Sequence, residues 1–255
     1  MSQRWRLWAL ACGAACCLAG LGLTPYDPYA QAFFELRLSG PSWQHWLGVD
    51  RLGQDYFSRV WRGASNSLIF ALAGSLSSLT LAAGLLVLER RGGPLLAKAA
   101  RAWVAFGIAL PAIFIGLLIA TFMERSAGAL TLAISLAGVP FAFRQLRVLW
   151  MELTGAAYVE ASRAIGGGSW HLFRFTLWPN LLPQLVEIWK LVFAYALLEL
   201  SALTYLGLAG DPNWAELGTL MREGQKLLLN DARFVLWPGL LLCALLGMVR
   251  LVRVE

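Results

Sequence analysis

Apolar residues in this chain gather in six blocks separated by more polar connections. Most blocks are about 17–25 residues long, the length that a helix needs to cross the hydrocarbon core of a membrane. They show no alternation of apolar and polar positions, so a membrane-spanning barrel is excluded. Backbone groups in lipid must be hydrogen-bonded within their own segment, and we therefore predict an all-α, polytopic transmembrane helical bundle of about six spans. The predicted spans cover residues 7–23, 64–88, 100–123, 128–149, 181–200 and 234–249.

Two of the connections are unusually long. Residues 24–63 contain three prolines in their first two thirds, and apolar and charged positions at helical spacing over 55–62 predict a short interfacial helix. Residues 144–178 are too polar to span and too patterned for a plain linker. We accordingly divide the chain into an N-terminal part, 1–63, with one span and the external segment, and a core domain, 64–255, with five spans.

The composition supports a membrane protein and excludes a soluble domain of this length. Of the 255 residues, 58% are hydrophobic and 14% are charged, whereas soluble domains carry about 25% charged residues. Arg4 and Arg6 precede the first apolar block, an arrangement that also resembles a signal peptide. We favour an uncleaved first span, because the block is long enough to cross the membrane and the later blocks embed the rest of the chain.

The distribution of charge predicts the orientation. The net charge is +6, but no basic run interleaved with aromatic residues indicates a nucleic-acid partner. With the N-terminus in the cytoplasm, the cytoplasmic connections hold 12 Lys and Arg residues and the external connections hold 8, as the positive-inside rule requires. Tryptophans near the ends of several predicted spans fit an interfacial belt in contact with membrane lipid. We predict a multi-pass protein with both termini in the cytoplasm.

The connection between the fourth and fifth spans carries the most informative motif. Good helix formers fill residues 159–165, with Glu160 and Arg163 at i,i+3 spacing, and three glycines at 166–168 interrupt them. A second short helical stretch follows at 170–177. The pattern predicts two short helices joined by a glycine bend below the membrane, a shape that suits docking into a groove of a partner.

This segment resembles the EAA loop of ABC importer permeases. Glu160-Ala161-Ser162 is followed by Gly166 at the spacing of that family, although Ser162 stands where the family has Ala and Trp178 where it usually has Leu before Pro. In the family this loop is the coupling helix that docks onto the ATPase subunit. The resemblance therefore implies an ATPase-coupling loop formed by Tyr158, Glu160, Ala161, Ser162, Arg163, Gly166 and Trp170.

Two further stretches resemble the peptide/nickel/opine branch of these permeases. Residues 200–240 are similar to its last external loop and the entry into its final span, and residues 45–68 resemble its external signature. Gln54 and Ser65 depart from that signature, because the family usually has arginine there. The matching positions are Gly48, Asp50, Gly53, Asp55, Ser58, Arg59, Gly63, Ser67 and Leu68.

The resemblance also implies partners and cargo. It implies the second permease of a heterodimeric pore in a bacterial inner membrane, working with a homologous permease, two ATPase subunits and a substrate-binding protein. The implied cargo is short peptides, nickel, or an opine-type or metallophore ligand. No cofactor is expected.

Charged residues in the fifth predicted span have two interpretations. Glu187 and Lys190 are spaced to pair on one helix face, and Glu199 lies near the outer end. They could form a polar lining of the pore, or an internal ion pair near the interface with Lys190 snorkelling. Three residues of the third span likewise have two interpretations: they could allow a kink, or they could permit close helix packing. These residues are Gly107, Pro111 and Gly116.

The sequence does not favour an enzyme. It contains no GxxxxGK[ST] phosphate-binding loop and no GxSxG motif, its four cysteines show no metal-ligand spacing, and His45 and His171 fall on opposite sides of the predicted membrane. A membrane-embedded enzyme, such as an intramembrane protease or a lipid transferase, would need paired acids, or a serine with a histidine, at one depth within the spans. Glu187 and Glu199 are about 18 Å apart along a helix, too far for a pair. The other alternative is a secondary transporter, which would function without any ATPase.

Overall fold

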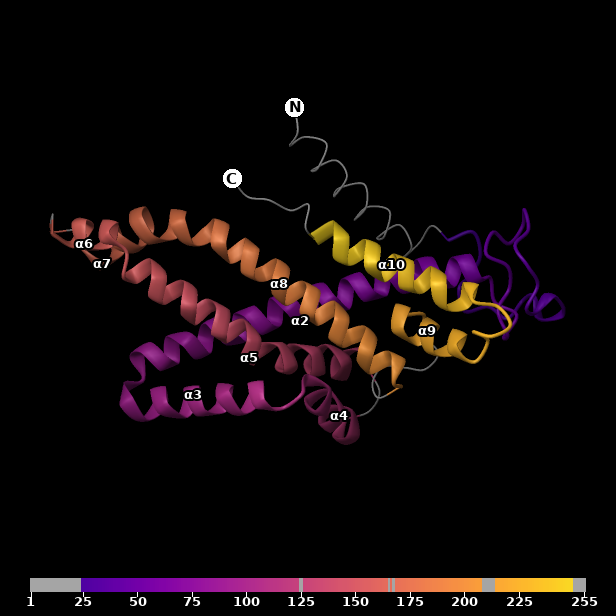
Figure 1. Ribbon diagram of the computed structural model, residues 1–255, viewed down its shortest axis with the longest axis horizontal. Helices are drawn as coiled ribbons and strands as arrows, with labels where there is room; N and C mark the ends of the chain where they lie inside the picture. The colour runs from indigo at the N-terminus through magenta and orange to yellow at the C-terminus, as the bar shows by residue number, and fades with distance from the viewer. Residues whose placement is uncertain (1–23, 124–125, 165, 167, 208–213, 250–255) are drawn as a thin grey trace, which may run out of the picture.

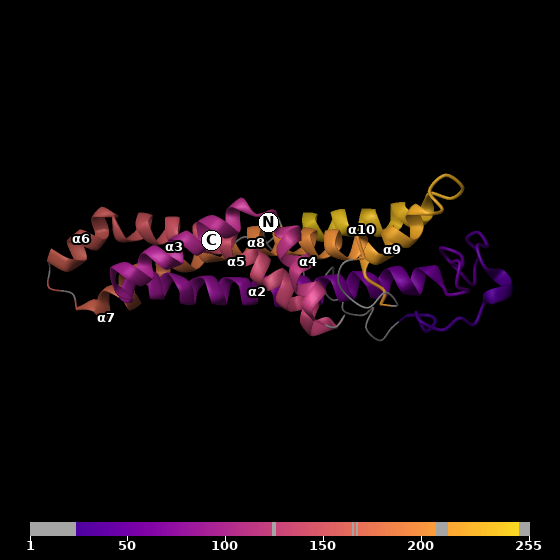
Figure 2. The same ribbon diagram turned by 90° about the horizontal axis from the view of Figure 1, so that it is seen from below.

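The computed structural model describes residues 24–123, 126–164, 166, 168–207 and 214–249. Over these residues the chain is all-α, as predicted, and the β-structure there is limited to an isolated bridge between Val49 and Asp55. The molecule is elongated, and its long helices run roughly along its longest axis (Figure 1, Figure 2). The helices are η1 (Phe34–Leu36), α2 (Tyr56–Arg91), α3 (Gly93–Ala109), α4 (Ala112–Phe122), α5 (Ala127–Thr154), α6 (Ala157–Ala164), α7 (Ser169–His171), the π-helical turn η2 (Leu172–Leu177), α8 (Trp178–Tyr205), α9 (Leu217–Gln225) and α10 (Arg233–Val249).

The two ends of the bundle are built from different segments. α6 and α7 lie at one end, where they extend beyond the turn that joins α2 to α3 (Figure 1, Figure 2). The segment 24–55 lies at the opposite end, next to α9 and the start of α10 (Figure 1). We call these the α6 end and the α9 end.

Several helices can cross a membrane. Three stretches are long and apolar enough on their own, namely α2, α5 and the continuous helix from Leu172 to Tyr205. α3 and α4 pass the same test only as a pair, with a bend of 97° between them, which is the geometry of a broken span or of a re-entrant loop. α10 is apolar but shorter, with 17 residues. The first predicted span, 7–23, lies outside the described residues, so the total of six spans stays a prediction.

The third predicted span, 100–123, is not one straight helix, and the kink that the sequence left open is present. α3 and α4 are separated by Leu110 and Pro111. Pro111 has no backbone N–H to continue the helix, and Leu110 before it is extended, with φ −84° and ψ 131°. The bend therefore follows from the proline.

Close packing is also present along α3 and α4. A Cβ atom on Gly107 would lie 2.5 Å from Cγ of Pro140, and one on Gly116 would lie 2.5 Å from Cδ2 of Leu203. Both glycines thus let a neighbouring helix approach, which small residues favour within membranes. The kink and the close packing occur together in α3 and α4.

The interfacial helix predicted at 55–62 is wrong as a separate element, because it forms the first turns of α2. Asp55 caps this helix by accepting a hydrogen bond from the backbone N–H of Ser58 at 2.8 Å. α2 then continues without a break through Gly63, so the predicted division of the chain at this residue falls inside a helix. With 36 residues, α2 is about 54 Å long, whereas the hydrocarbon core of a membrane is about 30 Å thick. At least one end of α2 therefore extends beyond the hydrocarbon core.

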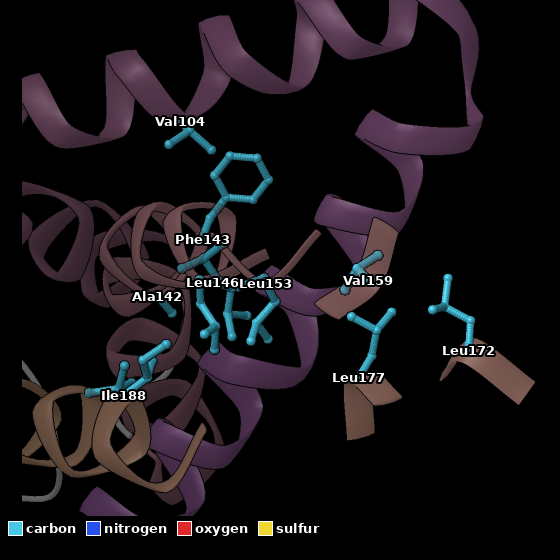
Figure 3. Close-up of a cluster of buried hydrophobic side chains, with 13 residues drawn as sticks. Val104, Ala142, Phe143, Leu146, Leu153, Val159, Leu172, Leu177 and Ile188 are labelled. Atoms are coloured by element: carbon cyan, nitrogen blue, oxygen red, sulfur yellow. The ribbon is translucent and has the colours of Figure 1, made fainter. Parts of the chain in front are cut away.

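α5 lies at the centre of the bundle and packs against α2, α3, α4 and α8. Small residues bring α2 and α5 together: a Cβ atom on Gly138 would lie 2.5 Å from Oγ of Ser78, and this hydroxyl donates to the carbonyl oxygen of Ser135 at 2.8 Å. Larger side chains form two main clusters, one toward the α6 end (Figure 3) and one that includes Leu217 of α9. The core thus continues from α9 to the loop of α6 and α7.

Candidate functional site

α6 is held to the bundle by one apolar anchor. Val159 is fully buried and belongs to the same cluster as Leu153 of α5 and Leu172 and Leu177 of η2 (Figure 3). The predicted pair of short helices is present, and the second one continues through η2 directly into α8. The exposed side chains of the first helix include Tyr158, Glu160 and Ala161.

The bend between the two short helices depends on Gly166. Its φ is +81°, a left-handed conformation that glycine adopts without strain. Beyond the bend, Trp170 is 73% exposed. Oγ of Ser162 accepts a hydrogen bond from Oγ1 of Thr176 at 3.3 Å, which ties α6 to η2. The side chain of Arg163 is not among those described. The loop therefore combines a fixed inner side with an outer surface that carries aromatic side chains and Glu160.

At the α9 end, Arg59 joins three segments of the chain. Its Nη1 donates to Oδ2 of Asp50 at 2.6 Å and to Oε2 of Glu223 at 2.8 Å, and its Nη2 donates to Oε1 of Glu223 at 3.3 Å. Arg59 lies in the first turn of α2 and is 2% exposed, Asp50 precedes α2, and Glu223 lies on α9. A buried guanidinium needs such acidic partners, since an unpaired charge there would be strongly destabilising.

The other predicted signature residues support the start of α2. Gly48 and Gly53 have φ of +78° and +74°, and Oδ1 of Asp50 accepts hydrogen bonds from the backbone N–H groups of Leu52 and Gln54, at 2.8 and 2.9 Å. Gly63 faces α9, where a Cβ atom would lie 3.0 Å from Cδ1 of Leu220. The signature therefore marks a folded junction between the external segment, α2 and α9.

The structure brings His45 next to Asp55 and Ser58, three residue types that also occur in hydrolase sites. Nδ1 of His45 lies 2.8 Å from Oδ1 of Asp55, and Oγ of Ser58 donates to Oδ2 of Asp55 at 2.7 Å. A serine nucleophile must contact its histidine base, whereas here the carboxylate stands between the two and all three residues are buried. This arrangement holds the N-terminus of α2 in place.

Glu216, at the start of α9, is a buried carboxyl group that the sequence analysis missed. It accepts hydrogen bonds from Oγ of Ser67 at 2.8 Å and from the backbone N–H groups of Gly218 and Thr219 at 2.9 and 3.2 Å, and it also bonds Oγ1 of Thr204. Glu216 therefore fastens α9 to both α2 and α8. Burial raises the pKa of Glu216 above its ordinary value, although these hydrogen bonds oppose the rise. Glutamate is not among the preferred capping residues, so no capping signal pointed to it.

The charged residues of α8 divide into a pair and a separate carboxyl group. Nζ of Lys190 lies 2.5 Å from Oε2 of Glu187, and the two side chains are 12% and 57% exposed. Glu199 lies farther along α8, and its Oε1 is buried without a hydrogen-bond partner among the described residues. Near it, the rings of Tyr195 and Phe141 stack with centroids 5.3 Å apart. The structure thus confirms the predicted pairing of Glu187 with Lys190 and leaves Glu199 apart from it.

Comparison with known proteins places the chain in a family. Residues 60–252 match the family described as "Binding-protein-dependent transport system inner membrane component". The chain belongs to this family. It is therefore a membrane-integral permease of a binding-protein-dependent ABC importer, a transport component rather than an enzyme.

Curated relatives of the permease carry names of peptide transporters. It is 31% identical to the di/tripeptide transport system permease protein DppC of Pseudomonas aeruginosa, over 88% of this chain and 76% of the relative. It is 30% identical to the glutathione transport system permease protein GsiD of Pectobacterium atrosepticum, over 86% and 72% of the two chains. It is also 29% identical to the probable D,D-dipeptide transport system permease protein DdpC of Escherichia coli, over 85% and 72%.

Solved structures support the fold. The inward-facing methionine ABC transporter MetNI contains a chain that superposes on the permease with a TM-score of 0.64 and 19% identity, over 75% of this chain and 91% of that chain. A second crystal form of MetNI gives a TM-score of 0.60 and 21% identity. At these identities the likeness establishes the architecture of an ABC importer permease and not its cargo.

Proposed function

We propose that this permease forms half of the translocation pathway of an ABC importer for short peptides. In this proposal it pairs with a second, homologous permease, two ATPase subunits drive transport, and a substrate-binding protein delivers the cargo. Short peptides are favoured over nickel or an opine-type ligand, because the relatives described above are named for peptides and glutathione. The observation that carries the proposal is the helical loop of α6 and α7, which projects from one end of a membrane-spanning bundle (Figure 2).

The loop has the properties that transmission of force requires. Its outer surface carries Tyr158, Glu160 and Trp170, which are exposed and available to an ATPase subunit. Its inner side is fixed by Val159, and η2 joins the loop to α8 without an intervening flexible segment. A push on α6 would therefore reach α5 through the apolar cluster and α8 through the helix itself. A rigid docked element of this kind suits a two-state transition.

We place the pathway along one face of α8. Asn180, Gln184 and Glu187 follow each other at spacings of four and three residues and are all exposed. They belong to a membrane-spanning stretch, and polar side chains there avoid lipid and face a partner or a water-filled space. Glu187 would line this face while Lys190 holds its carboxylate. Glu199, which lies on a different face of α8, would contribute a second polar position. The orientation that we propose puts both termini and the α6 end in the cytoplasm of a bacterium, with the protein in the inner membrane.

Reconstitution tests this function. The permease, its partner permease and the ATPases are placed in proteoliposomes, and uptake of labelled dipeptide, tripeptide and nickel is measured with the substrate-binding protein and with or without ATP. We expect ATP-dependent uptake of peptide that is lost without the ATPases. Uptake driven by an ion gradient alone would show a secondary transporter, and uptake of nickel in place of peptide would change the cargo but not the class.

A further inference from the structure

The corner between α2 and α3 carries basic side chains that face outward. Arg90 and Arg91 are the last two residues of α2, and Lys98 lies in the second turn of α3. All three are exposed, and within the described part of the chain none of them forms an ion pair. The two helices are joined only by a tight turn in which Gly93 has a φ of +77°, so no loop covers these side chains.

The acidic residue nearest in sequence does not neutralise this corner. Glu89 turns inward, and its side chain is 4% exposed. Its Oε1 is shared by Nη1 of Arg101 at 3.3 Å and Nε of Arg147 at 3.2 Å. The two positive charges of Arg101 and Arg147 already exceed the single negative charge of Glu89. Within the described part of the chain, the outward-facing charge of Arg90, Arg91 and Lys98 is therefore not neutralised, and it is available to a ligand.

Apolar side chains adjoin the basic ones. α3 packs against α2 and α5 and leaves its outer face uncovered. The large apolar side chains exposed at the end of α2 and along this face are Leu88, Leu95, Leu96, Trp103 and Phe106. A ligand that satisfies the whole surface needs a negative group at the corner and hydrocarbon along α3. Free phosphate or an acidic protein segment would use only the first of these features.

The position of the corner fits a membrane surface. α6 and α7 extend past it along the axis of the bundle in both views (Figure 1, Figure 2), so the corner does not lie at the tip of the molecule. In the orientation that we propose, it would lie near the boundary of the membrane. We propose that the α2–α3 corner is a binding site for an anionic phospholipid. Arg90, Arg91 and Lys98 donate to the phosphate oxygens, and the acyl chains lie along the exposed face of α3.

Lipid titration tests this site without relying on transport. The full chain, purified with whatever subunits accompany it in an uncharged detergent, is titrated with phosphatidylglycerol or phosphatidylcholine, and native mass spectrometry counts the bound lipids. The triple variant Arg90→Gln, Arg91→Gln, Lys98→Gln is compared with Arg37→Gln, Arg51→Gln, Lys226→Gln, which removes the same charge from exposed positions near the α9 end. A second variant, Arg90→Lys with Arg91→Lys, keeps the charge.

The wild-type protein should prefer phosphatidylglycerol. We expect its affinity for this lipid to fall about a hundredfold in the corner triple variant, or about fivefold for each basic side chain lost, and to stay within about threefold in the lysine variant. The α9-end triple should bind as the wild type does. Equal binding of both lipids by the wild type, or an equal loss in the two triples, would overturn the proposal. So would a corner triple that keeps its lipid and instead loses an accompanying protein subunit. If the corner triple does not fold, the lysine variant and the comparison of the two lipids on the wild type decide.

Discussion

Arg59 and Glu223 are 164 positions apart in the sequence, yet two hydrogen bonds of 2.8 and 3.3 Å join them. The pair connects the first turn of α2 to α9, and Asp50 adds the external segment at 2.6 Å. Three segments that fold from distant parts of the chain thus depend on one guanidinium. Replacing it should loosen the whole α9 end.

We predict that Arg59→Gln destabilises the protein by about 3 kcal/mol, because Asp50 would lose the partner of a buried charge. Glu223 is partly exposed, so the loss of its contact with Arg59 adds less to the destabilisation. Thermal unfolding of the purified protein measures the effect. Arg51→Gln removes a neighbouring but exposed charge and serves as the control. Equal melting temperatures of the two variants would show that the contact contributes little.

Glu160→Lys should weaken the association with the ATPase subunit and leave membrane abundance unchanged, because Glu160 is exposed on α6 and supports no internal contact in the described structure. Co-purification of the ATPase and substrate-stimulated ATP hydrolysis are the readouts. Glu152→Lys makes the same charge change at an exposed position near the end of α5. Normal hydrolysis in Glu160→Lys at normal abundance would mean that α6 is not the coupling element.

Gly166→Ala should reduce coupling while Gly168→Ala does not. A Cβ atom at either position would meet nothing within 4 Å, so space is not the difference. Only Gly166 of these two has a positive φ, and alanine there would be strained by about 1–2 kcal/mol. The ratio of substrate-stimulated to basal ATP hydrolysis reports the change. The conformational argument fails if the two variants behave alike.

Glu216→Gln should change how stability depends on pH. Burial raises the pKa of Glu216, so its protonated form is favoured in the folded state more than in the unfolded state. The stability that this adds is present below the ordinary pKa of a glutamate and is lost as the pH rises through the raised value. The wild type should therefore lose stability relative to Glu216→Gln with increasing pH. Melting curves of both proteins that stay parallel across the pH series would contradict this.

Gly138→Ala should destabilise the contact between α2 and α5 by about 1–3 kcal/mol, since its Cβ atom would lie 2.5 Å from Oγ of Ser78. Gly84→Ala on α2 is the matched control, because a Cβ atom there meets nothing within 4 Å. Replacing glycine by alanine raises the helix propensity equally at both positions. The difference between the two melting temperatures therefore measures the cost of the close contact with Ser78. A stabilised Gly138→Ala protein would show that the two helices can separate without loss.

The sequence predicted those parts of the structure that depend on neighbouring residues. Helix formers around Glu160 and the glycines at 166–168 are local signals, and both appear in the loop. The hydrogen bonds from Arg59 to Glu223 and from Ser67 to Glu216 join segments more than 140 positions apart, and no periodicity along the chain encodes such contacts. The bend at Pro111 was partly predictable. The apolar composition of residues 100–123 predicted one span, and Pro111 is the residue that decides whether this span stays straight.

α2 carries Arg59 near one end and Glu89 near the other, on one helix that contains no proline. The two residues are about 45 Å apart along its axis. Such a helix behaves as a rod between the α9 junction and the corner that it shares with α3. A tilt of about 10° would shift one end by about 8 Å relative to the other. In the importer that we propose, a movement of α2 at one face of the membrane would therefore be accompanied by a movement at the opposite face, because a single helix joins the two.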